Sequence, residues 1–132
     1  MPDDASVTIE RLTASRDARG SVVEPLASDA LRRQRNVHVV LTEPGCVRGN
    51  HYHERGTEVL TVWGPALVRL REARGIRDVA VEAGVVLRFV IPPGVAHAVK
   101  NTGDGPNLLV AFNDVAHDPA APDVVRDVLI EP

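Results

Sequence analysis

The sequence predicts an all-β protein, folded as a sandwich or barrel of short strands. Valine-rich runs of mixed apolar and polar residues recur along the chain, and β-branched residues favour the pleated surface of a sheet. Gly and Pro separate these runs at short intervals, where they supply the backbone angles of tight turns. No segment longer than the possible helical turn at 28–35 has a helical pattern. Regularly spaced short strands are typical of β-sandwiches and β-barrels.

The predicted strands follow one another closely along the chain. In order, they cover residues 7–12, 21–26, 36–42, 57–62, 66–72, 76–81, 85–91, 95–100 and 107–113. The turn signals between them lie at residues 43–45, 63–65, 73–75, 82–84, 92–94 and 102–106. The segment after His117 begins as a linker broken by prolines. We expect it to end in one more strand or short helix that docks on the barrel.

Composition indicates a soluble globular protein of 132 residues. We expect a single domain over residues 1–132, with a core at about 34–113 and a C-terminal tail at 114–132. The formal net charge of -3 does not suggest nucleic acid or an acidic membrane as partner. Cys46 is the one cysteine, so no internal disulfide can form. The acidic N-terminus lacks an apolar signal region, and we therefore expect a cytoplasmic protein.

A candidate metal site begins at His51 and His53. Side chains two apart on a strand project to the same face, so these two imidazoles point together. Glu58 follows after four residues, enough for the chain to turn and bring a carboxylate to the same point. His97 follows the tight turn of 92–94 and could join from a distant strand. Such a set suits zinc, iron, manganese, nickel or copper. The alternative is that these are polar wall residues, but their burial without a ligand would leave several polar groups to satisfy.

Two segments of the chain resemble the two motifs of the cupin superfamily. The first motif is matched by Gly45–x5–His51–x–His53–x4–Glu58–x5–Gly64, with the last spacing one residue short. The core of the second motif is matched by Pro92–x–Gly94–x2–His97–x3–Asn101, although Gly84 lies two residues too far upstream. The resemblance implies a cupin β-barrel, also called a double-stranded β-helix or jelly roll. It also implies that His51, His53, Glu58 and His97 are the metal ligands.

The flanking segments resemble sugar-nucleotide enzymes within the cupins. "DARGSVVEPL" and "RGNHYH" are similar to segments of nucleotide-sugar 3,5-epimerases and 3,4-ketoisomerases. "IPPGVAHAVKNTGD" and "HDPAAPD" resemble the C-terminal metal-binding cupin domain of capsular-polysaccharide enzymes that epimerise a keto-sugar nucleotide. A lysine usual just before their glutamate ligand is absent here, where the run reads Glu54, Arg55, Gly56 and Thr57. The resemblance implies zinc first, with iron, manganese or nickel as alternatives.

The function we expect is that of a metal-dependent epimerase or isomerase. Its substrate would be a keto-deoxysugar nucleotide, in polysaccharide or natural-product sugar biosynthesis. His38 is the candidate proton-transfer residue, because histidine is well suited to this role near neutral pH. Strand alternation leaves open which face it occupies. Arg48 could bind a diphosphate or lie on the rim, and Asn50 could contact substrate or form a turn.

Two other functions use the same residues. A metal-dependent dioxygenase acting on a small organic substrate would bind iron through the same ligands, and a non-catalytic cupin would bind a small ligand. For assembly, we expect a homodimer in which residues 7–12 add a strand to the partner's sheet.

Overall fold

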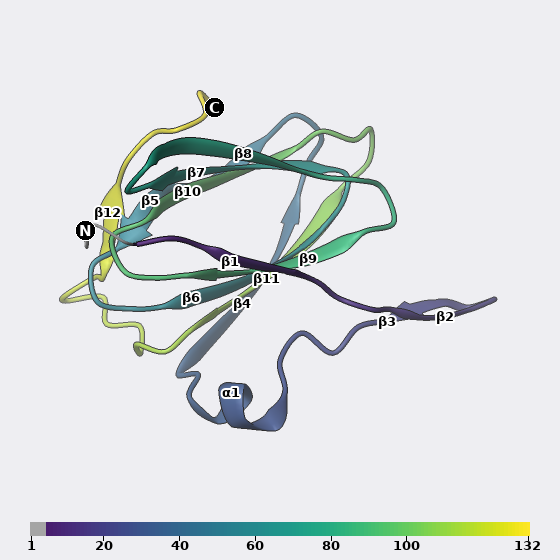
Figure 1. Cartoon of the computed structure of the whole chain (residues 1–132), viewed down its shortest axis with the longest axis horizontal. Helices are drawn as coiled ribbons and strands as arrows, with labels where there is room; N and C mark the ends of the chain where they lie inside the picture. The colour runs from purple at the N-terminus through teal and green to yellow at the C-terminus, as the bar shows by residue number, and fades with distance from the viewer. Residues whose placement is uncertain (1–4) are drawn as a thin grey trace.

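The computed structural model describes residues 5–132 and confirms the all-β prediction. Two antiparallel five-stranded sheets pack face to face, as the cupin resemblance implied (Figure 1). The β4 sheet has the order β1-β9-β6-β11-β4, and the β5 sheet has the order β12-β5-β10-β7-β8. The strands are β1 (Thr8–Arg11), β2 (Ser15–Asp17), β3 (Gly20–Val22), β4 (Asn36–Thr42), β5 (Val47–His53), β6 (Glu58–Trp63), β7 (Ala66–Glu72), β8 (Gly75–Val81), β9 (Val86–Ile91), β10 (Ala96–Asn101), β11 (Asn107–Asn113) and β12 (Val124–Arg126).

The hydrophobic core fills the space between the two sheets. Along β7, Ala66, Val68 and Leu70 point inward and are fully buried, and they alternate with Arg69 and Arg71 on the outer face. The opposite sheet contributes inward-facing residues such as Phe89, Val62 and Leu109. This alternation on both sheets is what makes a two-layer sandwich bury one continuous apolar cluster.

The N-terminal region differs from the prediction in two respects. The strand expected at 21–26 ends at Val22, and with β2 it forms a separate hairpin that projects from the body (Figure 1). The chain then passes to helix α1 (Ser28–Arg32), which confirms the helical turn. Leu26 and α1 cover part of the outer face of the β4 sheet. The strand expected at 7–12 pairs with β9 of the same chain, so its predicted place in a partner's sheet is corrected.

A β-bulge in β5 decides which side chains reach the interior. His51 is paired with His97, but the next pair along the ladder is Gly49 with Ala98, so Asn50 is the extra residue. Gly49 and Asn50 have positive φ values of 87° and 58°. A Cβ atom on Gly49 would lie 2.7 Å from the carbonyl oxygen of His97, which explains the glycine. The bulge reverses the alternation, so that Arg48 faces inward together with His51.

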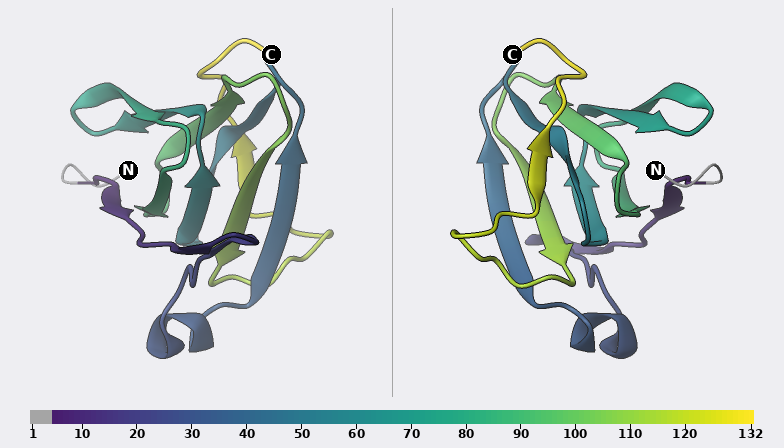
Figure 2. Two further views of the ribbon diagram at one scale, coloured as in Figure 1. Left: turned by 90° about the vertical axis from the view of Figure 1, so that its right-hand side faces the viewer. Right: turned by 90° about the vertical axis from the view of Figure 1, so that its left-hand side faces the viewer.

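The C-terminal tail lies against the open side of the sandwich. β12 pairs with β5 and forms the edge of its sheet, facing the side where β4 lies (Figure 2). This pairing confirms that the tail ends in a short docked strand. Across residues 5–132, no helix has the length and apolar character that crossing a membrane requires.

Candidate metal centre

Three histidines and one glutamate converge between the sheets. His51, His53, Glu58 and His97 each offer a ligand atom, and these atoms all lie within 4.8 Å of one another. The imidazole centroids are 4.9 to 5.9 Å apart. β5 and β10 supply the histidines from one sheet, and β6 supplies Glu58 from the other. The spacing predicted from the sequence is therefore realised as one compact cluster.

The hydrogen bonds around His97 leave one ring nitrogen free for the cluster. Its Nδ1–H donates to the carbonyl oxygen of Val95 at 3.1 Å, which fixes the tautomer. Its Nε2 is buried, has no hydrogen-bond partner among residues 5–132, and lies 3.5 Å from Glu58 Oε2. A buried unpaired nitrogen is unusual, since such a group costs free energy unless something binds it. A metal ion would satisfy it.

The contacts of His53 and Glu58 also suit a cation. His53 Nε2 donates to Glu58 Oε2 at 2.5 Å, and Asn113 Nδ2 donates to His53 Nδ1 at 3.3 Å. Two ligands on opposite sides of an ion with bonds of about 2.1 Å would stand roughly 4.2 Å apart, which is close to the size of this cluster. The donor set of imidazoles and one carboxylate therefore fits a divalent transition metal or zinc.

The charge state of the metal-free cluster follows from burial and proximity. Burial alone would raise the pKa of Glu58, but the charge of His97 and the hydrogen bond from His53 hold it well below its usual range. Burial alone would lower the pKa of His97, but the charge of Glu58 outweighs this and raises it. Burial, together with the neighbouring His97, lowers the pKa of His51 to about 4. The folded cluster is thus built around an ionised carboxylate.

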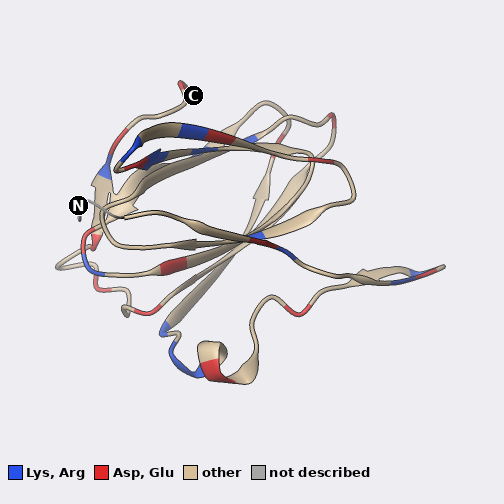
Figure 3. Cartoon of the chain, in the orientation of Figure 1, with Lys and Arg blue, Asp and Glu red and all other residues tan. Residues whose placement is uncertain are grey.

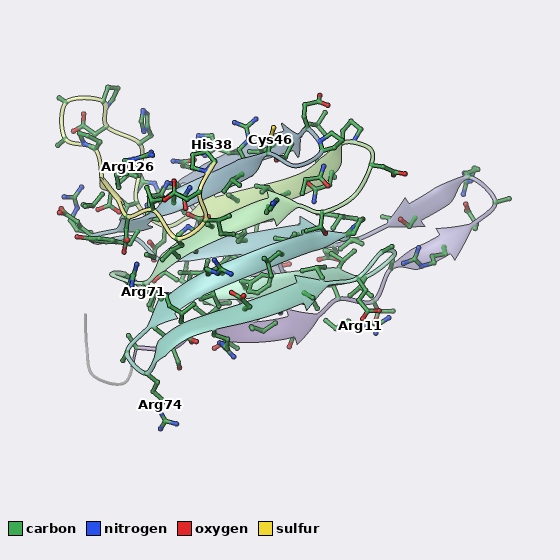
Figure 4. All side chains as sticks on the ribbon, turned by 90° about the horizontal axis from the view of Figure 1, so that it is seen from above. Arg11, His38, Cys46, Arg71, Arg74 and Arg126 are labelled. Atoms are coloured by element: carbon green, nitrogen blue, oxygen red, sulfur yellow. The ribbon has the colours of Figure 1, made fainter. Side chains whose placement is uncertain are left out.

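The cluster forms one wall of a cavity of about 270 Å³. His38 also lines this cavity, from the inner face of β4. Strand alternation alone does not decide between the inner and the outer face for this residue. Arg48 lines it from the other sheet, and its Nη2 donates to the carbonyl oxygen of Leu41 at 3.2 Å. The rest of the lining is largely apolar: Val40, Leu60, Val99, Leu109, Ala111 and Val124. Figure 4 shows His38 on the same side of the molecule as the tail.

Asn50, expected to contact substrate, has a different role. It is buried, and its Nδ2 donates to the carbonyl oxygen of Ile130 at 2.9 Å. Its Oδ1 accepts hydrogen bonds from the backbone N–H groups of Leu129 and Ile130. Because these bonds occupy the side chain, Asn50 anchors the tail to β5 and is not available to a substrate.

Sequence reasoning missed the residues of the tail that surround the cluster. Asp123 Oδ2 lies 3.7 Å from His53 Nδ1, and its carboxylate also accepts backbone hydrogen bonds from the turn before Glu58. Asp123 and His117 line a smaller cavity of about 100 Å³ together with His38 and His53. The one signal in the sequence is the "HDPAAPD" run, which ends at Asp123 and resembles a segment of the capsular-polysaccharide enzymes.

The fold and the ligand set together define a cupin with a candidate metal centre. Residues 15–125 match the family described as "Polysaccharide biosynthesis C-terminal domain", and the chain belongs to that family. The spore coat polysaccharide biosynthesis protein SpsL of Bacillus subtilis is 26% identical over 133 residues, which cover 91% of this chain and 86% of SpsL.

Solved structures share the architecture. The capsular polysaccharide assembling protein CapF of Staphylococcus aureus superposes with a TM-score of 0.65 and 26% identity over 89% of this chain. This chain spans 33% of CapF. A dTDP sugar isomerase of Desulfovibrio desulfuricans superposes with a TM-score of 0.75 over 94% of this chain and 85% of its own, at 21% identity. At that identity the likeness establishes the shared fold.

The lowered pKa of His51 predicts how the metal-free protein responds to acid. Between the ordinary pKa of 6.5 and about 4, the unfolded chain binds a proton at His51 that the folded protein does not. The free energy of unfolding should therefore fall as the pH falls through this window. The raised pKa of His97 places its contribution mainly above pH 6.5, and the lowered pKa of Glu58 adds to the loss of stability only as the pH approaches 4.5, its ordinary pKa.

We expect the His51→Gln variant to lose less stability than the native protein between about pH 6.5 and about pH 4.5. Chemical denaturation in the presence of a chelator measures this difference. His117→Gln, a change in the exposed tail, serves as the control and should follow the native protein. Equal acid sensitivity in all three proteins would show that His51 is not the source of the loss of stability.

Proposed function

We propose that the protein is a metal-dependent epimerase or isomerase that acts on a keto-deoxysugar nucleotide. The observation that carries the proposal is the convergence of four candidate ligands with His38 and Arg48 in one cavity. Membership of a polysaccharide biosynthesis family supports this class of substrate. CapF, at 26% identity, is named for the assembly of capsular polysaccharide, and this adds further support.

Epimerisation or isomerisation beside a ketone begins with the loss of a proton from carbon. The C–H bond breaks, its electron pair forms an enolate, and the proton moves to a base. A bound divalent metal would supply Lewis-acid stabilisation of the developing oxyanion. His38 is the base we propose, because its imidazole lines the cavity without belonging to the ligand cluster. Return of the proton to the other face, or to a neighbouring atom, completes the reaction.

The size of the cavity indicates which part of the substrate it holds. Its volume of about 270 Å³ lies below the roughly 300–1,000 Å³ of sites for drug-sized ligands. The sugar ring would therefore occupy the cavity, with the nucleotide outside it. Arg48 extends across to β4, where its guanidinium could bind the diphosphate. The apolar lining would exclude water from the reacting carbon.

The proposed ligand set predicts the effect of removing each histidine. Replacing His51, His53 or His97 by Ala should remove most of the bound metal, because each change deletes one of four protein ligands. Elemental analysis of purified protein measures the metal, with zinc expected first and iron, manganese or nickel as alternatives. Full retention of bound metal in two of the three variants would contradict the ligand assignment.

The proposed reaction predicts metal-dependent exchange of a carbon-bound proton. A 4-keto-6-deoxyhexose nucleotide in D2O should take up deuterium with the native protein. Exchange should fall by orders of magnitude after chelation, because stabilisation of the enolate is worth several kcal/mol. His38→Ala should slow exchange while the metal stays bound. Arg74→Ala, in the exposed turn between β7 and β8, is the control and should leave exchange near the native rate.

Two outcomes would point elsewhere. Undiminished exchange in metal-free protein would indicate a histidine-based isomerase without a metal. Consumption of O2 by an iron-loaded protein that exchanges no keto-sugar nucleotide would favour the dioxygenase, and ligand binding without either reaction would favour the non-catalytic cupin.

We also propose that the protein forms a homodimer through the outer face of β4. Val37, Val39 and Leu41 are 55%, 68% and 65% exposed and form one row on this edge strand. β4 has no charged residue, whereas β7 and β8 carry both signs of charge (Figure 3).

Val39→Asp should yield a monomer in light scattering at micromolar concentration, because it puts a charge into a dry interface. Ile76→Asp, on β8, changes another exposed apolar residue (53% exposed) and should remain a dimer. A monomeric native protein would contradict the proposal.

A further inference from the structure

Within the part of the chain that the structure describes, no hydrogen bond joins two residues of the turn between His53 and Glu58. Residues 54–57 connect His53 to Glu58, and each of their four backbone N–H groups is donated to the segment that follows β11. Glu54 N–H donates to the carbonyl oxygen of Asp123, and Thr57 N–H donates to Asp114 Oδ1. The backbone of this turn is therefore held from outside, by residues that lie 57 to 69 positions later in the chain.

Asp123 accepts most of these bonds. Its two carboxylate oxygens accept the N–H groups of Arg55 and Gly56, each at 2.9 Å. With its own carbonyl oxygen bonded to Glu54, it fixes three consecutive residues of the turn. Its side chain is 11% exposed, so these charge-assisted bonds are largely shielded from water. These hydrogen bonds fix the backbone just before β6, and they therefore fix the position of Glu58, the first residue of that strand.

The same carboxylate also faces the imidazole of His53. Asp123 Oδ2 lies 3.7 Å from Nδ1, while Nε2 points to Glu58 in the cluster. An imidazole that binds a metal through one nitrogen carries its proton on the other, and that N–H requires an acceptor. Asn113 presents its Nδ2 donor to His53 Nδ1, because its Oδ1 accepts the N–H of Val115. Asp123 Oδ2, a carboxylate acceptor 3.7 Å from this nitrogen, would come within hydrogen-bond distance after a shift of a few tenths of an ångström.

We propose that Asp123 is a positioning residue of the metal centre, which holds the His53–Glu58 turn in place and orients the His53 ring. The C-terminal segment then helps to determine the geometry of the metal centre. This inference rests on the proposed function only in requiring that the cluster binds a metal. It concerns the affinity and geometry of that site, whichever reaction follows.

The test compares Asp123→Asn with Asp127→Asn. Asp127 is a carboxylate of the same segment and pairs with Arg71, but it has no contact with the turn among the described hydrogen bonds and ion pairs. Competitive titration of Zn²⁺ measures affinity, and the visible spectrum of the Co²⁺-loaded protein reports ligand geometry. Thermal unfolding of the metal-free proteins measures the purely structural effect.

We expect Asp123→Asn to weaken Zn²⁺ binding by roughly 10- to 100-fold and to change the Co²⁺ spectrum. Asp127→Asn should keep the native spectrum and change affinity by less than about fivefold. Native affinity and a native spectrum in Asp123→Asn would overturn the inference. Equal losses in the two variants, in proportion to their thermal destabilisation, would also overturn it, because both changes would then act through general stability.

A milder variant is useful if Asp123→Asn does not fold. Asp114→Ala removes the side-chain acceptor of the Thr57 N–H alone and should weaken Zn²⁺ binding by about threefold to tenfold. Unchanged affinity in that variant would count against the turn as a determinant of the site. Absence of Zn²⁺ binding by the native protein would instead refute the metal dependence of the proposed function, an outcome distinct from failure of Asp123 alone.

Discussion

The ionised carboxylate of Glu58, buried among three imidazoles, is the constraint on which the site depends. A carboxylate in an apolar interior is unfavourable unless charges and hydrogen bonds compensate for its lost hydration. Here His53 donates a hydrogen bond to it, and its negative charge raises the pKa of His97 against the effect of burial. Each of these histidines is held in turn by another group, at Val95 and at Asn113. The polar centre of the sandwich is thus one connected network within an otherwise apolar core.

The two-sheet architecture brings this network together from opposite layers. Glu58 begins β6 in the β4 sheet, while the histidines come from β5 and β10 in the other sheet. Any relative shift of the sheets would separate the carboxylate from the imidazoles. Close packing of fully buried residues such as Phe89 and Leu70 opposes such a shift. The core therefore contributes to function by keeping the distance between the layers fixed.

Strand alternation predicted much of this arrangement, since His51 and His53 lie two apart and do point together. Alternation could not predict the bulge, because positive φ at Asn50 leaves no trace in a pattern of apolar and polar residues. The sequence alone therefore leaves Asn50 open between a substrate contact and a turn, whereas in the structure its amide anchors the tail. The face of His38 was settled only by the pairing of β4 with β11, which is a contact between distant segments. Asp123 was overlooked for the same reason, since its partners lie 67 and 68 residues earlier.

The dependence of the ligand turn on β12 also has a kinetic consequence. β12 has three residues and lies at the edge of its sheet, where local opening requires little free energy. When this strand frays, the amides of Arg55 and Gly56 lose their acceptors at the same moment as His53 loses its neighbouring carboxylate. Amide hydrogen exchange in the turn and the departure of an ion from the cluster would then be limited by one shared motion. The residence time of the metal would be set by the opening of a strand, and not by the strength of its ligand bonds alone.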